Sequence, residues 1–247
     1  MVEGIYVFEN LSATEGIPLF NDGYSSLIIM PSQQHNSNVS YQNQSTEVHA
    51  LWVCGTLQEQ ALWNNPQGLE QMLVVRFFPH VLPSLFPMHV QQLKEQPILN
   101  FEQLLDPKIY MEFTALYYKK TRLQDQLQAL QGLLRKIYKP VESLPPLLVE
   151  RISLYKEETA YLGRNASPKE APVNYKWWQR NFKKYMGMGP KRFAEAQRLL
   201  YAYALMDANS SLNLMEIALQ CGYYDANHLI KDFKKQIGYS PKFFFNR

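Results

Sequence analysis

Residues 214–245 read LMEIALQCGYYDANHLIKDFKKQIGYSPKFFF. The start of this stretch predicts a short helix, because Leu214, Ile217 and Ala218 fall three and four positions apart and form one apolar stripe. Gly222 then breaks the helix, since glycine takes a positive φ at no steric cost. A tight corner is therefore expected after the first helix.

A second helix is expected directly after this corner. Asp225 is a good N-cap for it. One side of the helix carries an apolar residue at every fourth position: Leu229, Phe233 and Ile237. The other side is polar and basic: Asn227, Lys231, Lys234 and Lys235. Gly238 ends this helix, and Ser240 with Pro241 begins a last short one. The exposed, basic helix is thus the second one, as in a helix-turn-helix that reads the major groove.

This order of residues resembles the second helix-turn-helix of the AraC family of bacterial transcription regulators. The elements of that signature are Ile217 with Ala218, Gly222 with Tyr223, Phe233 with Lys234, Gly238, and Ser240 with Pro241. A chance glycine turn would not carry the downstream elements at the right distances. The resemblance implies DNA binding and an earlier, first helix-turn-helix in the same chain.

The expected earlier copy is present in part. Asn174 can cap a helix that ends at Gly187. Its buried side is expected to be Trp178, Phe182 and Tyr185, and its exposed side Tyr175, Lys176, Gln179, Arg180 and Lys183. Pro190 then begins a long helix that runs to about Met206 and would join the two readers. One chain is therefore predicted to reach two successive major grooves.

The first unit departs from the family pattern just upstream of Asn174. Its own scaffold helix is expected in residues 167–173, but Pro168 and Pro172 bracket this segment and allow only a short helical turn. We therefore predict a shortened first unit, supported in part by an apolar helix in residues 147–162.

Charge is distributed unevenly along the chain. Residues 173–247 contain twelve Lys and Arg against five Asp and Glu, whereas residues 1–172 contain thirteen against seventeen. The mild net charge of +3 thus hides a basic module on an acidic body, which is typical of a phosphate-binding surface. An ordinary solvated helix face is the alternative, and the coincidence of charge and motif favours DNA.

Composition bounds the class of protein. A length of 247 residues allows two domains, and 46% hydrophobic residues suffice for real cores. No export signal and no membrane-spanning stretch is recognisable, so a cytoplasmic protein is expected. Cys54 and Cys221 fall in different predicted domains, which argues against a disulfide. Cys221 is expected to be a small buried residue, with a redox sensor as the alternative.

The first hundred residues have a different texture. Short apolar runs at residues 5–8, 26–30, 48–54 and 72–78 are separated by Asn, Gln, Ser, Gly and Pro, which predicts strands and turns of a small antiparallel β domain. Three features resemble the cupin-like sensory domain of one branch of AraC-like regulators. They are Phe20-Asn21-Asp22-Gly23, Gly55 between Cys54 and Thr56, and Val75-Arg76-Phe77-Phe78-Pro79.

An enzyme is a weaker reading of this domain. A cupin metal site uses two or three histidines with a carboxylate, commonly with two histidines alternating on one strand. The histidines here are scattered and form no such pair: His35, His49, His80 and His89. No phosphate loop, nucleophile elbow or Cys-x-x-Cys pair is present either. We predict no catalytic residue, no metal site and no cofactor.

A pocket for a small effector is a further possibility, because barrels of this size can enclose one ligand. Its candidate lining is Tyr24, Trp52, Trp63, Arg76 and Phe78. Aromatic residues in strands are more often plain core residues, which is the alternative.

A possible dimerisation segment lies between the two halves. From Ile109 to Ile137 the chain carries apolar residues at alternating steps of four and three, interrupted by Lys120: Phe113, Leu116, Leu123, Leu127, Leu130 and Leu134. This heptad pattern fits a dimeric coiled coil. It fits equally a helix, or a helix pair broken near 119–121, that packs on its own β domain.

The sequence thus predicts an α+β protein and a bacterial transcription regulator that resembles the AraC family. Residues 1–105 are expected to form a cupin-like sensory domain, 106–144 helices that link or dimerise, and 145–247 an all-α domain with two helix-turn-helix units. The second reader is expected to touch DNA through Tyr224, Asp225, Ala226, Asn227, Ile230, Lys231, Lys234 and Lys235. The expected partners are double-stranded DNA, an unknown effector, RNA polymerase, and a second copy of the chain that would pair through residues 109–137. A repurposed protein-interaction module is the alternative.

Overall fold

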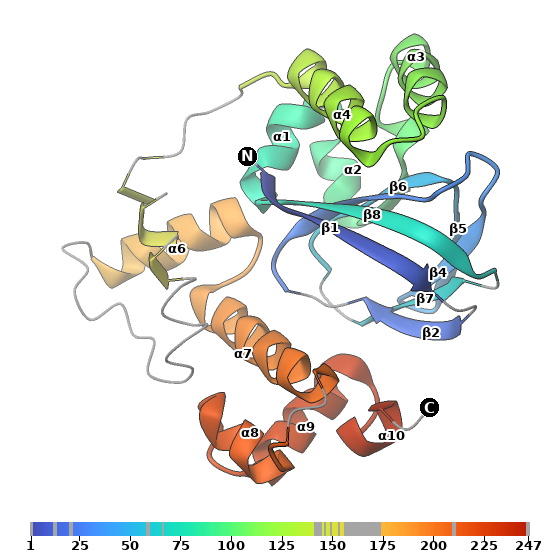
Figure 1. Ribbon diagram of the computed structural model, residues 1–247. Coiled ribbons are helices and arrows are strands. Elements are labelled where there is room, and N and C mark those ends of the chain that lie inside the picture. Colours follow the sequence, from blue (N-terminus) through green and yellow to red (C-terminus); the bar gives the residue numbers. More distant parts are fainter. Residues whose placement is uncertain are drawn as a thin grey trace. The chain divides into compact units, whose positions relative to one another are not determined.

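The chain divides into two compact units. The computed structural model (Figure 1) describes residues 2–11, 14–19, 22–57, 60–65, 67–140, 145, 147–148, 150–152, 154–155, 174–208 and 211–245. The first unit comprises residues 1–19 and 24–143, and the second comprises 20–23 and 144–247. The strands and the helices up to residue 137 therefore belong to one unit.

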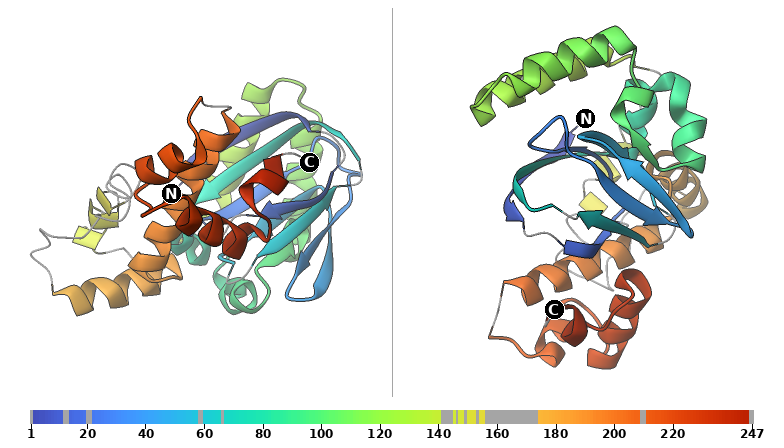
Figure 2. Two further views of the ribbon diagram at one scale, coloured as in Figure 1. Left: turned by 90° about the horizontal axis from the view of Figure 1, so that it is seen from below. Right: turned by 90° about the vertical axis from the view of Figure 1, so that its right-hand side faces the viewer.

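The first unit is built on two antiparallel sheets (Figure 2). A five-stranded sheet has the order β1-β8-β3-β6-β9 and a four-stranded sheet the order β2-β7-β4-β5. The strands are β1 (Val2–Leu11), β2 (Thr14–Leu19), β3 (Ser25–Ile29), β4 (Ser37–Tyr41), β5 (Gln44–Val48), β6 (Leu51–Cys54), β7 (Ala61–Asn65), β8 (Leu69–Phe77) and β9 (Ile98–Asn100). The predicted α+β class with an N-terminal antiparallel β domain is confirmed.

The apolar run of residues 48–54 does not form the one strand that its pattern had predicted. β5 ends at Val48 and β6 begins at Leu51, and the two strands lie in different sheets. Ala50 lies between them, and its carbonyl accepts the Met30 amide at 2.7 Å. Because apolar residues continue through this corner, periodicity alone did not separate the two strands. The polar-rich strands β4 and β5, which pair with each other, also went unpredicted, because neither carries an apolar run.

Aromatic residues that were candidates for a ligand pocket fill the space between the sheets. Trp52 on β6 and Trp63 on β7 are 1% and 3% exposed, and their rings lie 6.4 Å apart. The Trp63 Nε1 donates to Ser37 Oγ at 2.9 Å. These two residues are core residues. Tyr24 is buried as well, but its neighbour is a charged side chain: the Arg76 guanidinium lies 4.3 Å from the centroid of the Tyr24 ring.

Helices complete the first unit. They are the short α1 (Leu82–Leu85) and α2 (Val90–Glu95), followed by α3 (Pro107–Tyr118) and α4 (Leu123–Ile137). Asp106 caps α3 by accepting the amides of Lys108 and Ile109. In Figure 1, α3 and α4 lie side by side above the five-stranded sheet.

The heptad pattern from 109 to 137 therefore serves two separate helices. Phe113 of α3 and Leu130, Leu134 and Ile137 of α4 are buried in the same core as the strands. Leu116, a seam position, is 48% exposed, while its neighbour Tyr117 is buried. The heptad seam fails within α3, because Phe113 and Tyr117, four positions apart, face the core and Leu116 does not. The helix also breaks between Tyr118 and Leu123, and the two helices pack on the β domain of their own chain.

Burial of His80 makes the stability of the first unit dependent on pH. Desolvation lowers the pKa of this imidazole to about 4, and the ring stacks on Phe78 with centroids 5.7 Å apart. The unfolded chain binds the proton more tightly, near pH 6.5. The stability that the neutral ring contributes is therefore complete above about pH 6.5 and is lost as the pH falls towards 4. We expect His80→Gln to flatten this part of the curve of melting temperature against pH. Parallel curves for the two proteins between pH 6.5 and 4 would contradict this assignment.

The second unit is helical in its described parts. It contains α6 (Tyr175–Met186), α7 (Pro190–Asp207), α8 (Leu214–Gln220), α9 (Ala226–Ile237) and α10 (Pro241–Phe245). Each begins and ends within about a residue of the expected position, because caps and stops are encoded locally: Asn174, Pro190, Asp225 and Pro241 at the starts, and Gly187 and Gly238, both left-handed, at the ends.

Asp22 and Gly23 also pack within the second unit. Gln197 Nε2 on α7 donates to the Asp22 carbonyl at 2.7 Å. Gly23 has a φ of +83°, and a Cβ at this position would lie 2.7 Å from Phe193 Cδ2. Only glycine fits both the backbone conformation and the close approach to α7.

Candidate nucleic-acid interface

Helix α9 has an exposed side and, opposite to it, a completely buried apolar side. Leu229, Phe233 and Ile237 have no exposed surface, and they join the core formed with α7 and α8. The stripe expected from the sequence is therefore confirmed. Burying these residues fixes which side of α9 remains in solvent.

Residues predicted to read DNA lie on the solvent side of α9 or on its first turn. Tyr224 is 76% exposed, and the exposed polar and basic residues of the helix are Asn227, Lys231, Lys234 and Lys235. Ala226 and Ile230 are half-buried. Asp225 is half-buried too, and its carboxylate accepts the His228 amide at 2.7 Å, so it serves as the N-cap. The His228 ring packs against the Tyr223 ring, with 5.2 Å between the two ring centroids.

The corner between α8 and α9 has the geometry that its glycine predicted. Gly222 has a φ of +73°, and its amide donates to the Leu219 carbonyl at 3.1 Å. Tyr223 follows with 3% exposure and donates its amide to Ala218. At the start of α8, Asn213 and Glu216 form a capping box that the sequence reading missed, although Asn followed three residues later by Glu is its recognised signal.

Cys221 in this corner is a core residue. It is 2% exposed, and burial raises the pKa of its thiol to about 11. A thiol held protonated in this way is a poor nucleophile. The expectation of a small buried residue agrees with this environment.

The first reader, α6, presents its predicted face to solvent. Asn174 accepts the Lys176 amide at 2.9 Å and caps the helix. The residues expected to be outside are all exposed: Tyr175, Lys176, Gln179, Arg180 and Lys183. Gln179 Nε2 donates to the Tyr175 hydroxyl at 3.0 Å, so these two side chains hold each other on the helix surface.

One residue predicted for the buried side of α6 does not lie there. Tyr185 is half-buried, and Met186 takes the inner position with no exposed surface, after Trp178 and Phe182. Trp178, Phe182 and Met186 follow one another at steps of four, which places Tyr185 at the edge of the stripe. There the Lys184 ammonium lies 4.8 Å from the Tyr185 ring centroid.

Support for α6 comes from residues upstream of it. The described residues of the segment 147–155 are helical. The Tyr155 ring contacts Trp178, Phe182 and Phe193, and its hydroxyl donates to the Pro190 carbonyl at 3.1 Å. The predicted short turn in residues 167–173, with Pro168 and Pro172, lies outside the described residues, as does the end of the expected helix beyond 155.

Both exposed faces are basic. α6 contains no Asp or Glu, and its exposed cations are Lys176, Arg180, Lys183 and Lys184. The acidic residue of α9, Asp232, turns inward, where its Oδ2 lies 3.5 Å from the Arg198 guanidinium of α7. Sequence reading did not find this contact, because the two residues are far apart in the chain. Its effect is to leave the outer face of α9 with lysines alone as charged groups.

Other kinds of site find no support in the described residues. The histidines have separate neighbours: His35 bonds Asn65, His49 pairs with Glu102, His89 bonds Gln92, and His80 stacks on Phe78. In this part of the chain no three His, Cys, Asp or Glu side chains come together as a metal-binding group. Nor does any helix described here combine the length and apolar character of a membrane span.

The helical C-terminal part matches a known family. Residues 169–247 fit the model of a helix-turn-helix domain. The transcriptional activator RhaS of Salmonella arizonae is 33% identical over 63 residues, which cover 26% of this chain and 22% of RhaS, and RhaS of Salmonella newport gives the same values. This chain thus spans about a fifth of the length of the curated relatives it matches.

Solved structures share the fold of the whole chain. Two crystal structures of ToxT from Vibrio cholerae align with TM-scores of 0.52 and 0.53 at 13% and 14% identity. The alignments cover 98% of this chain and 97% and 96% of ToxT. They extend the likeness of fold to the N-terminal unit with its two antiparallel sheets. The C-terminal helix-turn-helix domain is thus similar to that of AraC-type transcription regulators.

Proposed function

We propose that this protein binds double-stranded DNA through the exposed faces of α6 and α9 and thereby regulates transcription. The observation that carries the proposal is the complete second helix-turn-helix. Its recognition helix has a sealed apolar side and an outer side whose charged residues are all basic. Phosphates are bound by such surfaces, and base edges are read from the first turns of the helix.

The residues on the outer side and first turn of α9 have roles that their chemistry suggests. The Asn227 amide suits an adenine edge, and Ala226 or Ile230 suits a thymine methyl group. Lys234 and Lys235 lie further along the helix and suit phosphates. On α6, Arg180 and Gln179 are the candidates for base contacts. Tyr224, Lys231, Tyr175, Lys176 and Lys183 complete the proposed interface.

The spacing between the readers supports binding to two successive grooves. α7 has 18 residues and connects α6 to the second helix-turn-helix. At 1.5 Å per residue it spans about 27 Å, which is compatible with major grooves about 34 Å apart.

The rival proposal is a helix-turn-helix reused to bind a protein. The relatives that match the C-terminal domain are named transcriptional activators, which favours DNA. The same names speak against an enzyme. Binding to duplex DNA that weakens steeply with salt would separate the two proposals, because counterion release accompanies phosphate contacts.

The first unit is proposed to modulate DNA binding, through a small effector or through self-association. ToxT, which shares the fold, has been solved bound to (E)-4-(8-methylnaphthalen-1-yl)but-3-enoic acid. In this chain the buried Trp52 Nε1 has no hydrogen-bond partner among the described residues, and an effector that opened this core and carried an acceptor would satisfy it. Melting of the intact protein with a panel of small organic acids tests this. A ligand that raises the melting temperature and shifts DNA affinity supports an effector.

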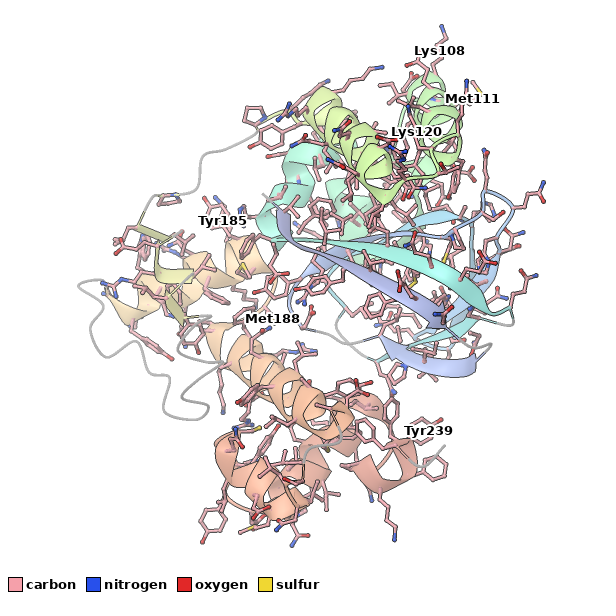
Figure 3. All side chains as sticks on the ribbon, in the orientation of Figure 1. Lys108, Met111, Lys120, Tyr185, Met188 and Tyr239 are labelled. Atoms are coloured by element: carbon pink, nitrogen blue, oxygen red, sulfur yellow. The ribbon has the colours of Figure 1, made fainter. Side chains whose placement is uncertain are left out.

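Self-association is proposed to use the outer sides of α3 and α4. Met111 is 60% exposed and Leu116 is 48% exposed, and Figure 3 shows Met111 and Lys108 on the outer side of α3. If this side pairs with a second copy, Leu116→Lys gives a smaller species in sedimentation than the parent protein. Lys94→Ala on α2, an exposed residue outside α3 and α4, is the surface control. An unchanged mass in the Leu116 variant contradicts a dimer through residues 109–137.

RNA polymerase is a proposed partner, and the cytoplasm, with the protein on the nucleoid, is the proposed location. Both follow from regulating transcription at DNA sites. Selection of genomic fragments by the purified protein, followed by footprinting, tests the central proposal. Protection of two adjacent major grooves supports both readers. Protection of one groove leaves α6 as support for α9, and no enriched fragment contradicts DNA binding by the free protein.

A further inference from the structure

The buried side of α9 carries a charged residue among apolar ones. Asp232 lies next to Phe233, and its Oδ2 lies 3.5 Å from the Arg198 guanidinium on α7. The same oxygen accepts the Tyr223 hydroxyl at 2.8 Å, and Oδ1 accepts Gln236 Nε2 at 3.0 Å. Three segments therefore meet at one carboxylate: the joining helix, the corner, and the recognition helix.

The partners of this carboxylate are themselves held in place. Arg198 is 8% exposed, and its guanidinium lies 4.1 Å from the centroid of the Tyr223 ring. Tyr223 is 3% exposed, and burial, with Asp232 adding to it, raises the pKa of its hydroxyl. The hydroxyl therefore stays protonated and donates to Asp232. A planar guanidinium between a ring and a carboxylate allows little rotation of either neighbour.

The remaining contacts of α9 do not set its rotation as strictly. Leu229, Phe233 and Ile237 pack against residues such as Leu199 and Ala202 of α7. Apolar packing is non-directional, so it tolerates small rotations that hydrogen bonds and ion pairs do not. A buried ion pair is weak evidence for stability, and its best-attested use is to specify one arrangement.

We propose that Arg198, Tyr223 and Asp232 are positioning residues, which set the rotation of α9 about its axis and thereby decide which of its side chains reach the bases. This proposal rests on the proposed function. None of the three residues needs to touch DNA.

The test compares Asp232→Asn with Asp207→Asn, which removes the same charge from an exposed position at the end of α7. Against the control, we expect Asp232→Asn to bind the selected site about tenfold more weakly. Binding to unrelated DNA and the slope of log K against log salt should stay equal, because no phosphate contact is lost. Equal affinity of both variants for the selected site would overturn the proposal.

A paired variant separates positioning from folding. Arg198→Met combined with Asp232→Leu leaves no buried unpaired charge, so its stability should recover towards that of the parent. Its preference for the selected site over unrelated DNA should stay low, because the directional contacts are gone. Recovery of both stability and preference would show a merely structural role and overturn the proposal.

A measurement without DNA distinguishes this proposal from the proposed function. Amide hydrogen exchange in residues 229–237 should be faster in Asp232→Asn than in Asp207→Asn, with α6 unchanged. If the parent protein binds no DNA, the proposed function fails. The exchange rates then decide by themselves whether Arg198, Tyr223 and Asp232 hold α9 in place. Equal exchange in the two variants would overturn it.

Discussion

Replacing Phe233 with alanine is expected to destabilise the second unit by about 3–5 kcal/mol. This ring has no exposed surface, and it contacts the rings of Phe244 and Phe245 at 5.9 and 6.2 Å between centroids. Its removal leaves a cavity where α7, α8, α9 and α10 meet, which the surrounding backbone can fill only in part. A loss of this size is a large part of the stability of a small domain.

Denaturant unfolding of the intact chain measures this loss, and hydrogen exchange assigns it to the second unit. Phe243→Ala is the matched control, because this phenylalanine of α10 is 54% exposed. The control should lose no more than about 1 kcal/mol, since more than half of this side chain is already exposed. Similar losses in the two variants would mean that Phe233 is not the centre of this core.

Alanine at Lys231 or Arg180 is expected to weaken DNA binding without weakening the fold. Both side chains are exposed, so the free energy of unfolding should change by no more than about 0.5 kcal/mol. A phosphate contact by Lys231 predicts a uniform loss across sequences and a salt slope reduced by about one. A base contact by Arg180 predicts a loss of about 1–3 kcal/mol that is confined to the selected site.

Affinity measured over a range of salt concentrations distinguishes these roles. Lys94→Ala in α2 is the control for loss of one exposed positive charge. A loss with Lys231→Ala alone would restrict the interface to α9. If either variant lost stability in proportion to its affinity, that residue would be structural, and its proposed contact with DNA would be wrong.

Much of the second unit was predictable, because its signals are local. Asn174 and Asp225 cap their helices, and Gly222 and Gly238 take the left-handed conformation that the expected corner and stop require. Each signal acts within a few residues of where it lies. One position on the inner side of α6 was mispredicted: Tyr185 was expected there, and Met186 occupies it. Periodicity did not separate the two neighbours, since both lie near the edge of the apolar stripe.

Prediction was weaker where pairing is non-local. The order β1-β8-β3-β6-β9 joins strands separated by many residues, and the division between β5 and β6 depends on which sheet each strand enters. The apolar pattern of residues 109–137 suits a partner chain and the chain's own β domain equally. In the structure the core of the first unit receives Phe113, Leu130, Leu134 and Ile137.

The sequence by itself determined the helix-turn-helix, its caps and corner, and the basic side of each reader, because capping, glycine conformation and helical periodicity act over a few residues. Only the tertiary structure decided that Asp232 faces Arg198 and Tyr223, and that the helices of 107–137 pack on the strands of their own unit. The physical reason is the same in both cases: burial and charge pairing depend on which distant segments meet, and a residue pattern specifies a face without naming its partner.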